Sequence, residues 1–360
     1  MADHSAHRHG LRVLALTRYP RTGSTSRLRF LQYLPALHAA GVQVDVAPLW
    51  TQRHLDELYA GTPPSPWRVA SAYCRRLAGL LQVARYDVVW LETEVFPYLP
   101  SFAERAIASR GVPLVLDLDD AVFHKYDHHR HLGVRLALGK KIDSAMKRAR
   151  VVVAGSPYLE ARARAAGATR VELIPTVVDL GRYPPAAARS HTPPRVVWIG
   201  TSHNRRYLDE VAEPLRELSR DGCLKVTLIG AGEPKLPFPY RALAWHEDTE
   251  VEALRRCDIG IMPLPDTPFE RGKCGYKLIQ YMACGLPVVA SPVGINATLV
   301  RTGVTGFLAA RPSEWRDALL CLAREPALRS RLGACGRSLV EESYSLDVTA
   351  PRLAALFRSL

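Results

Sequence analysis

Short apolar runs alternate with longer amphipathic stretches along almost the whole chain. Short apolar runs bounded by glycine, proline or polar residues predict strands that are buried on both faces, and the amphipathic stretches between them predict helices. In the first half the predicted strands cover 11–17, 42–49, 87–93, 112–120, 150–156 and 170–176. Strands that alternate with helices in this way predict a parallel sheet covered on both sides.

The segment 182–194 (RYPPAAARSHTPP) interrupts this pattern and is typical of a linker. The pattern then starts again, with predicted strands at 195–201, 225–232, 257–264 and 286–292. We therefore predict an α/β protein with two Rossmann-like domains that face each other across a cleft. The expected domains are 1–185 and 186–344, and a terminal helix at 345–360 is expected to pack back on the first. Ligands of doubly wound sheets bind beyond the carboxyl ends of the strands.

Composition narrows the class of protein. With 48 Lys and Arg against 35 Asp and Glu, the net charge is +13, which favours anionic partners such as phospholipid headgroups or a polyanionic acceptor. We find no nucleic-acid-binding motif and expect no nucleic-acid partner. The seven cysteines are odd in number and form no C-x-x-C pair, so reduced thiols are expected.

Hydropathy and charge also bear on location. No apolar run approaches the roughly 20 residues that span a bilayer, and the start of the chain does not resemble a signal peptide. We therefore expect a cytoplasmic protein. The basic segment 139–150, together with Arg75 and Arg76, favours peripheral contact with the inner face of an anionic membrane. A solvated basic helix face remains the alternative.

The stretch 269–309 carries the most informative chemistry. A loop with glycine and lysine, ERGKCGYK, leads into the helix KLIQYMACG, whose positive N-terminal end suits a diphosphate. Gly294, in the following SPVGIN loop, allows a ligand to approach the backbone closely. The expected donor-binding residues of this stretch are Lys273, Gly275, Tyr276, Lys277, Gly294 and Asn296.

This stretch resembles the donor-binding signature of family 4 glycosyltransferases, an E-x7-E pattern followed by a small-residue helix end and PVVAS. RVVWIGTSHNRRYLDEVAEPL resembles the first strand and helix of the family's C-terminal domain, and WHEDTEVEALRRCDIGIMPL resembles the segment before the signature. The resemblance covers nearly all of the second half and the first half loosely. It implies the GT-B fold, a nucleotide-sugar donor and transfer with retention of configuration, with no metal or other cofactor.

Two positions depart from the family's pattern. Gln280 stands where the family has the second glutamate, which implies a ribose contact without charge assistance. Gly272 stands at the first glutamate's position, and Glu270, displaced by two residues, becomes the candidate contact to the transferred sugar. An exposed loop carboxylate is the alternative for Glu270.

The family also places an arginine and a lysine after the first strand of this domain. Here Thr201 follows Gly200 where the arginine is usual, so the resemblance assigns the cationic role to Arg205, with Arg206 beside it. Together with Lys277, these cations are expected to stabilise the departing nucleotide diphosphate.

In the first half, Gly23 and Ser24 follow the first strand and resemble the family's loop that approaches the donor phosphates. The acceptor-binding candidates are Arg27, Glu92 and Glu94. Asp119 and Asp120 are the candidates for orienting the acceptor hydroxyl or accepting its proton. A metal-binding D-x-D within LDLDD is the rival interpretation, but the doubly wound pattern argues against it. Among the histidines 124, 128, 129 and 131 no ordered ligand spacing emerges.

These observations predict a glycosyltransferase that moves a sugar from a nucleotide diphosphate donor to the hydroxyl of a glycan, a lipid-linked acceptor or a small molecule. Two alternatives remain open: another enzyme of the same fold, such as a nucleotide-sugar epimerase, and a catalytically inactive sugar-nucleotide-binding protein.

Overall fold

The computed structural model describes residues 10–184 and 191–360, which form two compact units. The first unit comprises residues up to Ile174 together with Thr349–Leu360, and the second comprises Pro175–Val348. Residues 185–190 of the predicted linker lie outside the described residues. Each unit is built around a six-stranded parallel sheet, which confirms the predicted fold class.

The sheet of the first unit has the strand order β2-β1-β3-β4-β5-β6. Its strands are built largely from Val, Leu and Ala, and β3, β4 and β5 are buried along their whole length, as expected of parallel strands covered on both faces. The strands are β1 (Leu11–Thr17), β2 (Val42–Pro48), β3 (Val88–Glu92), β4 (Leu114–Leu118), β5 (Val151–Ala154) and β6 (Val171–Leu173).

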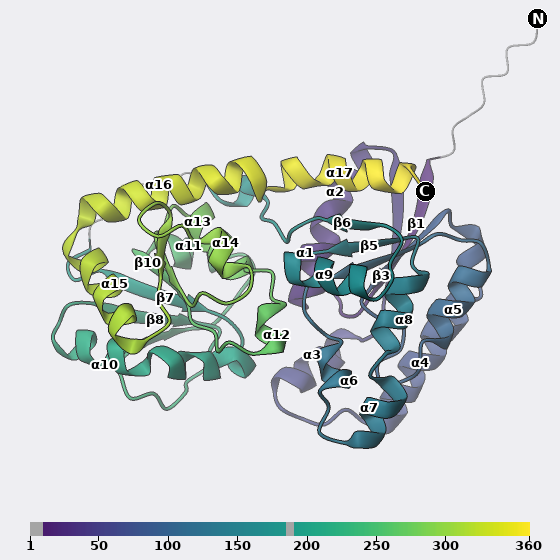
Figure 1. The fold of residues 1–360 in the computed structure, drawn as a ribbon, viewed down its shortest axis with the longest axis horizontal. Helices are drawn as coiled ribbons and strands as arrows, with labels where there is room; N and C mark the ends of the chain where they lie inside the picture. The colour runs from purple at the N-terminus through teal and green to yellow at the C-terminus, as the bar shows by residue number, and fades with distance from the viewer. Residues whose placement is uncertain (1–9, 185–190) are drawn as a thin grey trace, which may run out of the picture. The chain divides into compact units, whose positions relative to one another are not determined.

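Helices cover both faces of this sheet (Figure 1). They are α1 (Ser24–Arg29), α2 (Leu34–Ala39), α3 (Gln52–Tyr59), α4 (Pro66–Leu80), α5 (Phe102–Ser109), α6 (His124–Asp127), α7 (Leu132–Leu138), α8 (Lys141–Arg148) and α9 (Pro157–Ala165), with 3₁₀ turns η1 (Leu31–Tyr33) and η2 (Val83–Arg85). The last helix of the chain, α17 (Leu346–Arg358), returns to this unit. There Phe357 packs edge-on against Trp90, with ring centroids 5.2 Å apart, and Thr349 and Tyr33 share a hydrogen bond of 2.9 Å.

The sheet of the second unit has the order β12-β11-β10-β7-β8-β9. Its strands are β7 (Arg195–Ile199), β8 (Lys225–Ile229), β9 (Arg241–Leu243), β10 (Ile259–Met262), β11 (Val288–Ala290) and β12 (Gly306–Leu308). Apolar clusters fill both faces of this sheet, one with Leu278 and Met282 and the other with Trp198 and Trp315.

The helices of the second unit are α10 (Ala212–Arg220), α11 (Glu250–Arg255), α12 (Pro268–Arg271), α13 (Tyr276–Ala283), α14 (Asn296–Leu299), α15 (Pro312–Arg324) and α16 (Pro326–Ser343), with 3₁₀ turns η3 (Leu180–Arg182) and η4 (Ser202–Val211). α13 packs against α16, where Gly336 leaves room for Met282 because a Cβ there would lie 3.0 Å from its Cγ. This packing fixes the helix that carries the signature residues.

Candidate functional site

The strand order of each sheet locates its ligand-binding edge. In the second unit the chain runs from β7 to β8 on one side, whereas β10 lies on the other side of β7. In the first unit, β1 lies between β2 and β3 in the same way. Ligands of open parallel sheets bind beyond the carboxyl ends of the strands at such reversals. A ligand is therefore expected at the loops after β7 and β10 in the second unit and at those after β1 and β3 in the first.

In the second unit, Gly275 precedes α13 with a left-handed φ of +67°. A Cβ at this position would lie 2.5 Å from Cδ1 of Leu299, so both the conformation and the space require glycine. The loop 272–275 is thereby held against α14, and the positive end of the α13 dipole lies at the carboxyl edge of the sheet. This is a suitable place for an anion.

Lys277, on the first turn of α13, lies beside the end of β7. Its ammonium group is 5.1 Å from the ring centroid of Trp198. A Cβ on Gly200 would come within 3.2 Å of the Lys277 side chain and 2.6 Å of the Trp198 ring, so Gly200 makes room for both. The structure therefore brings together Gly200, Lys277 and the N-terminus of α13, from segments almost eighty residues apart in the sequence.

Glu270 is buried, with 4% of its surface exposed, so the alternative of an exposed loop carboxylate is wrong. Its Oε1 accepts a hydrogen bond of 2.7 Å from the Tyr207 hydroxyl, and its Oε2 accepts one from Thr267. Burial alone would raise the pKa of this carboxyl, but the two hydroxyl bonds bring it below its usual value. The sequence did not identify Tyr207 and Thr267 as partners of Glu270. Neither residue belongs to a local pattern that predicts this contact.

Two of the predicted cations, Arg206 and Lys273, lie close to this carboxylate or to its aromatic neighbours. Arg206 places a guanidinium nitrogen 3.6 Å from Oε1 of Glu270. The ammonium group of Lys273 lies 5.1 Å from the ring centroid of Phe269 and 5.9 Å from that of Tyr207. Arg205 is exposed on η4. These cations lie on the surface of the second unit, where an anionic ligand can reach them.

Gln280, Gly294 and Asn296 have internal contacts that the sequence did not predict. Gln280 is 3% exposed, and its amide donates a hydrogen bond of 3.0 Å to the Tyr183 hydroxyl. Gly294 has a φ of +54°, and a Cβ there would lie 2.3 Å from the carbonyl oxygen of Arg271, so the close approach it permits in this structure is to the backbone of α12. Asn296 is fully buried and donates to the carbonyl of Ser291. Contacts of these residues with a donor stay predictions.

In the first unit, the loop after β1 is held by its own side chains and by β3. Gly23 directly precedes α1, and a Cβ there would lie 2.3 Å from Cβ of Tyr19, so the turn is too tight for any other residue. Ser24 is exposed. Ser26 accepts a bond from the amide of Tyr19 and donates one of 2.6 Å to Glu92. A donor contact by Gly23 and Ser24 stays a prediction.

The end of β3 is rich in buried acids. Glu92 and Glu94 are 3% and 6% exposed, and burial raises the pKa of Glu92. Glu94 forms an ion pair of 2.6 Å with the buried Lys141 and accepts a bond of 2.7 Å from Tyr126. Between the two acids, Thr93 has a left-handed φ of 60°, which is rare for a β-branched residue and is often found at functional sites. Acceptor contacts by Glu92 and Glu94 stay predictions.

Asp119 and Asp120 follow β4. Burial, with a smaller contribution from the neighbouring Asp120, raises the pKa of Asp119 to about 7, while a hydrogen bond with Thr25 of α1 opposes the shift. Lys125 faces the same pair of acids, and burial lowers its pKa. A carboxyl that titrates near neutral pH at the carboxyl edge of a sheet can accept or donate a proton at physiological pH.

The neighbouring arginines of α1 are interior residues. Arg27 and Arg29 are 4% and 2% exposed. Arg29 forms an ion pair of 2.8 Å with Asp117 and donates to the carbonyl of Ile174. Arg29 thereby ties α1 to β4. An acceptor contact by Arg27 stays a prediction.

The histidine-rich segment groups His124, Asp127 and His128 closely enough to share an ion. However, Asp127 also pairs with Arg162 at 3.0 Å, and both ring nitrogens of His124 already have partners, Asp127 and Tyr158, each at 2.8 Å. The adjacent guanidinium and the completed hydrogen bonds do not suit a cation site.

Two of the basic residues expected to face a membrane are inside the first unit. Lys141 is 4% exposed and Arg76 5% exposed, because each is drawn inward by a buried acceptor: Glu94 for Lys141 and the carbonyl of Thr17 for Arg76. Lys140, by contrast, is exposed. Among the helices that the structure describes, none is both long and apolar enough to cross a bilayer.

Comparison with known proteins agrees with this arrangement. Residues 29–182 match the family described as Glycosyltransferase Family 4, and residues 193–325 match the one described as Glycosyl transferases group 1. A D-inositol 3-phosphate glycosyltransferase of Actinosynnema mirum is 39% identical over 94 residues, 25% of this chain and 22% of the relative. The same enzyme of Pseudarthrobacter chlorophenolicus is 26% identical over 193 residues, 46% of this chain and 44% of the relative. The chain thus spans less than half the length of these relatives.

Solved structures with low sequence identity share the fold. A sucrose-phosphate synthase from Thermosynechococcus elongatus has a TM-score of 0.71 at 17% identity, covering 97% of this chain and 98% of its own. Anabaena HepE in complex with UDP has a TM-score of 0.70 at 16% identity, covering 97% and 100%. From the two family matches and this shared architecture, we conclude that the chain belongs to glycosyltransferase family 4 and has the GT-B fold.

Proposed function

We propose that this protein transfers a sugar from a nucleotide diphosphate donor to an acceptor hydroxyl, with retention of configuration. The observation that carries the proposal is the cluster of Gly200, Lys277 and the α13 N-terminus at the carboxyl edge of the second sheet. A helix N-terminus and a lysine that converge on one edge form a site for a diphosphate. Arg205 lies on η4, which follows β7 and Gly200 along the chain.

The second unit thus holds the donor. In the reaction, the bond between the anomeric carbon and the diphosphate oxygen breaks and a bond to the acceptor oxygen forms. Lys277 and Arg205 stabilise the negative charge that develops on the leaving diphosphate. Gln280 and Glu270 contact the ribose and the transferred sugar, which requires each to exchange part of its internal hydrogen bonding for the ligand.

The first unit supplies the acceptor site. Asp119, whose pKa of about 7 leaves a substantial fraction ionised at neutral pH, accepts or orients the acceptor's proton, and Asp120 supports it. Glu92 and Glu94, at the end of β3, contact the acceptor. Donor assays begin with UDP-glucose, because the structure of Anabaena HepE has been solved with that donor. They include an inositol phosphate among the acceptors, because the curated relatives are D-inositol 3-phosphate glycosyltransferases.

The test is a panel of UDP-, GDP-, ADP- and dTDP-sugars assayed for thermal stabilisation and for release of the nucleoside diphosphate. We expect one base to stabilise the protein and its sugar conjugate to be consumed only when an acceptor is present. Interconversion of the donor sugar without an acceptor would identify an epimerase. Binding without turnover on any acceptor would identify an inactive sugar-nucleotide-binding protein, and no binding at all would refute the donor site.

A further inference from the structure

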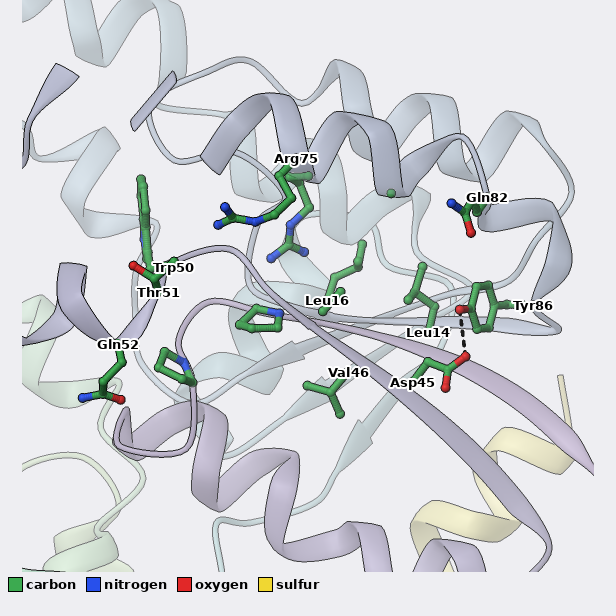
Figure 2. Close-up of a pocket in the computed structure, with 15 residues that line it drawn as sticks. Leu14, Leu16, Asp45, Val46, Trp50, Thr51, Gln52, Arg75, Gln82 and Tyr86 are labelled. Carbon is green, nitrogen blue, oxygen red and sulfur yellow. Dashed lines mark hydrogen bonds between the residues drawn. The ribbon is translucent and has the colours of Figure 1, made fainter. Parts of the chain in front are cut away.

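The first unit contains a groove that the proposed reaction does not use. It has a volume of about 500 Å³ and lies between α4 and the strands β1 and β2. Figure 2 shows Leu14, Leu16 and Val46 in its middle, with Trp50, Thr51 and Gln52 near one end and Asp45 and Tyr86 near the other. This volume is within the range of small-molecule sites.

The walls of the groove are mostly apolar. Val46 and Pro48 of β2 supply aliphatic surface along its length, and the nearly buried Leu14 and Leu16 of β1, 6% and 2% exposed, lie beneath them. At one end the Trp50 ring is held in place by stacking on His54, with centroids 4.1 Å apart. At the other end Asp45 accepts a hydrogen bond of 2.8 Å from Tyr86 and pairs with Arg12 at 3.7 Å, so its charge is already compensated. A ligand with an apolar chain fits these walls.

Two arginines of α4 give the groove a positive charge. Arg75 donates a hydrogen bond of 3.0 Å to the carbonyl of Leu49. Arg76 is 5% exposed and donates from Nη2 to the carbonyl of Thr17, whereas its buried Nη1 has no hydrogen-bond partner among the described residues. Burial, together with the neighbouring Arg75, lowers the pKa of Arg76 to about 10, although the charge of Glu92 opposes the shift. A buried guanidinium nitrogen with no acceptor is costly, and an anion in the groove would remove that cost.

We propose that this groove binds a linear anionic amphiphile, with its phosphate or carboxylate on Arg75 and Arg76 and its apolar chain along Leu14, Leu16 and Val46. The proposal combines the aliphatic walls with the orphaned donor of Arg76, and neither feature alone would identify this ligand. It goes beyond the transfer reaction and does not depend on it.

Gly79 offers a way to close the groove without disturbing the fold. It lines the groove from α4, one turn after Arg75 and Arg76, and a Cβ built on it meets no atom within 4 Å. A leucine at this position projects into the groove and also raises helix propensity. Gly133 of α7 is the matched control, since it is helical, has the same open space around its Cβ and lies outside the groove.

Isothermal titration calorimetry with dodecyl phosphate below its critical micelle concentration tests the proposal. Dodecyl maltoside has the alkyl chain without the charge, and inorganic phosphate has the charge without the alkyl chain, so the two serve as control probes. We expect one molecule of dodecyl phosphate to bind per chain, and Gly79→Leu and Arg76→Met to weaken it at least about tenfold. Gly133→Leu is expected to bind as the wild type does. If Arg76→Met does not fold, Gly79→Leu still decides.

Four results would overturn the proposal. The first three are equal affinity for dodecyl maltoside, equal affinity of Gly79→Leu and wild type, and binding only to vesicles of anionic phospholipid and not to the monomeric probe. Binding to vesicles alone would indicate a membrane-facing surface and not a groove that holds a single amphiphile molecule. Strong binding of inorganic phosphate alone would also contradict it, because the apolar walls would then contribute nothing.

Discussion

The two units share one architecture, but the candidate site residues at the carboxyl edge of their sheets differ, being mainly acids in the first unit and mainly cations in the second. In the first unit this edge carries Glu92, Glu94 and Asp119, of which the two glutamates are buried and bonded within the fold. In the second unit it carries Lys277 and Arg205, both accessible to a ligand. We infer that the doubly wound sheet determines where a site lies, whereas the side chains at its edge determine what the site binds. An anionic donor suits the second edge and a hydroxyl that must lose a proton suits the first.

The first prediction tests whether the acids of the first unit are structural. Lys141→Met leaves Glu94 without its buried partner at 2.6 Å, so we expect a loss of about 3–5 kcal/mol in the free energy of unfolding. Urea denaturation followed by circular dichroism measures it. Lys140→Met, next to it but exposed, is the control and is expected to change little. Equal stability of the two variants would contradict the ion pair's role.

The second prediction concerns the cations of the other edge. Lys277→Ala removes the ammonium group beside Gly200, and we expect kcat/KM for the donor to fall about 10²–10³-fold because the leaving diphosphate loses a charge partner. Lys225→Ala is the control, since Lys225 is exposed at the opposite, amino end of β8. If both variants keep wild-type activity, the donor site lies elsewhere.

Much of this contrast could be predicted from the sequence, because strands, helix ends and the signature loop leave local patterns. The alternation of apolar runs predicted both sheets, and ERGKCGYK predicted a helix N-terminus at α13. Burial of charge could not be predicted. Lys141 lies 47 residues from Glu94 and Arg29 lies 88 residues from Asp117, so only the tertiary fold turns these side chains inward. A basic run of residues has the same appearance whether its lysines face water or a buried carboxylate.

The third prediction asks whether the acidic edge takes part in proton transfer. The pKa of Asp119 is raised to about 7, so its ionised fraction, and with it kcat, is expected to rise as pH increases through 7. Asp119→Asn is expected to lower kcat about a hundredfold and to abolish this pH dependence. A wild-type profile in the variant would refute the assignment.

The same shift predicts an effect on stability. Because the folded pKa lies above the unfolded value of 3.8, the folded state binds the proton more tightly, so the stabilisation is complete below pH 4. It is lost as pH rises through 7. The difference in stability between wild type and Asp119→Asn is therefore expected to depend on pH between 4 and 7. A constant difference across this range would contradict the raised pKa.

The smallest effect expected concerns the loop that presents the second edge. Gly275 and Gly303 both have a left-handed φ, +67° and +77°, but only at Gly275 would a Cβ meet another atom, Cδ1 of Leu299 at 2.5 Å. Gly303→Ala carries only the conformational penalty of about 1 kcal/mol, whereas Gly275→Ala adds overpacking and is expected to lose about 2 kcal/mol or more in urea denaturation. Because Gly275 also sets the start of α13, its variant is expected to weaken nucleotide binding in calorimetry, and Gly303→Ala is not. Equal binding by both variants would mean that the diphosphate does not depend on the geometry of this loop, and the contrast between the two edges would then rest on charge alone.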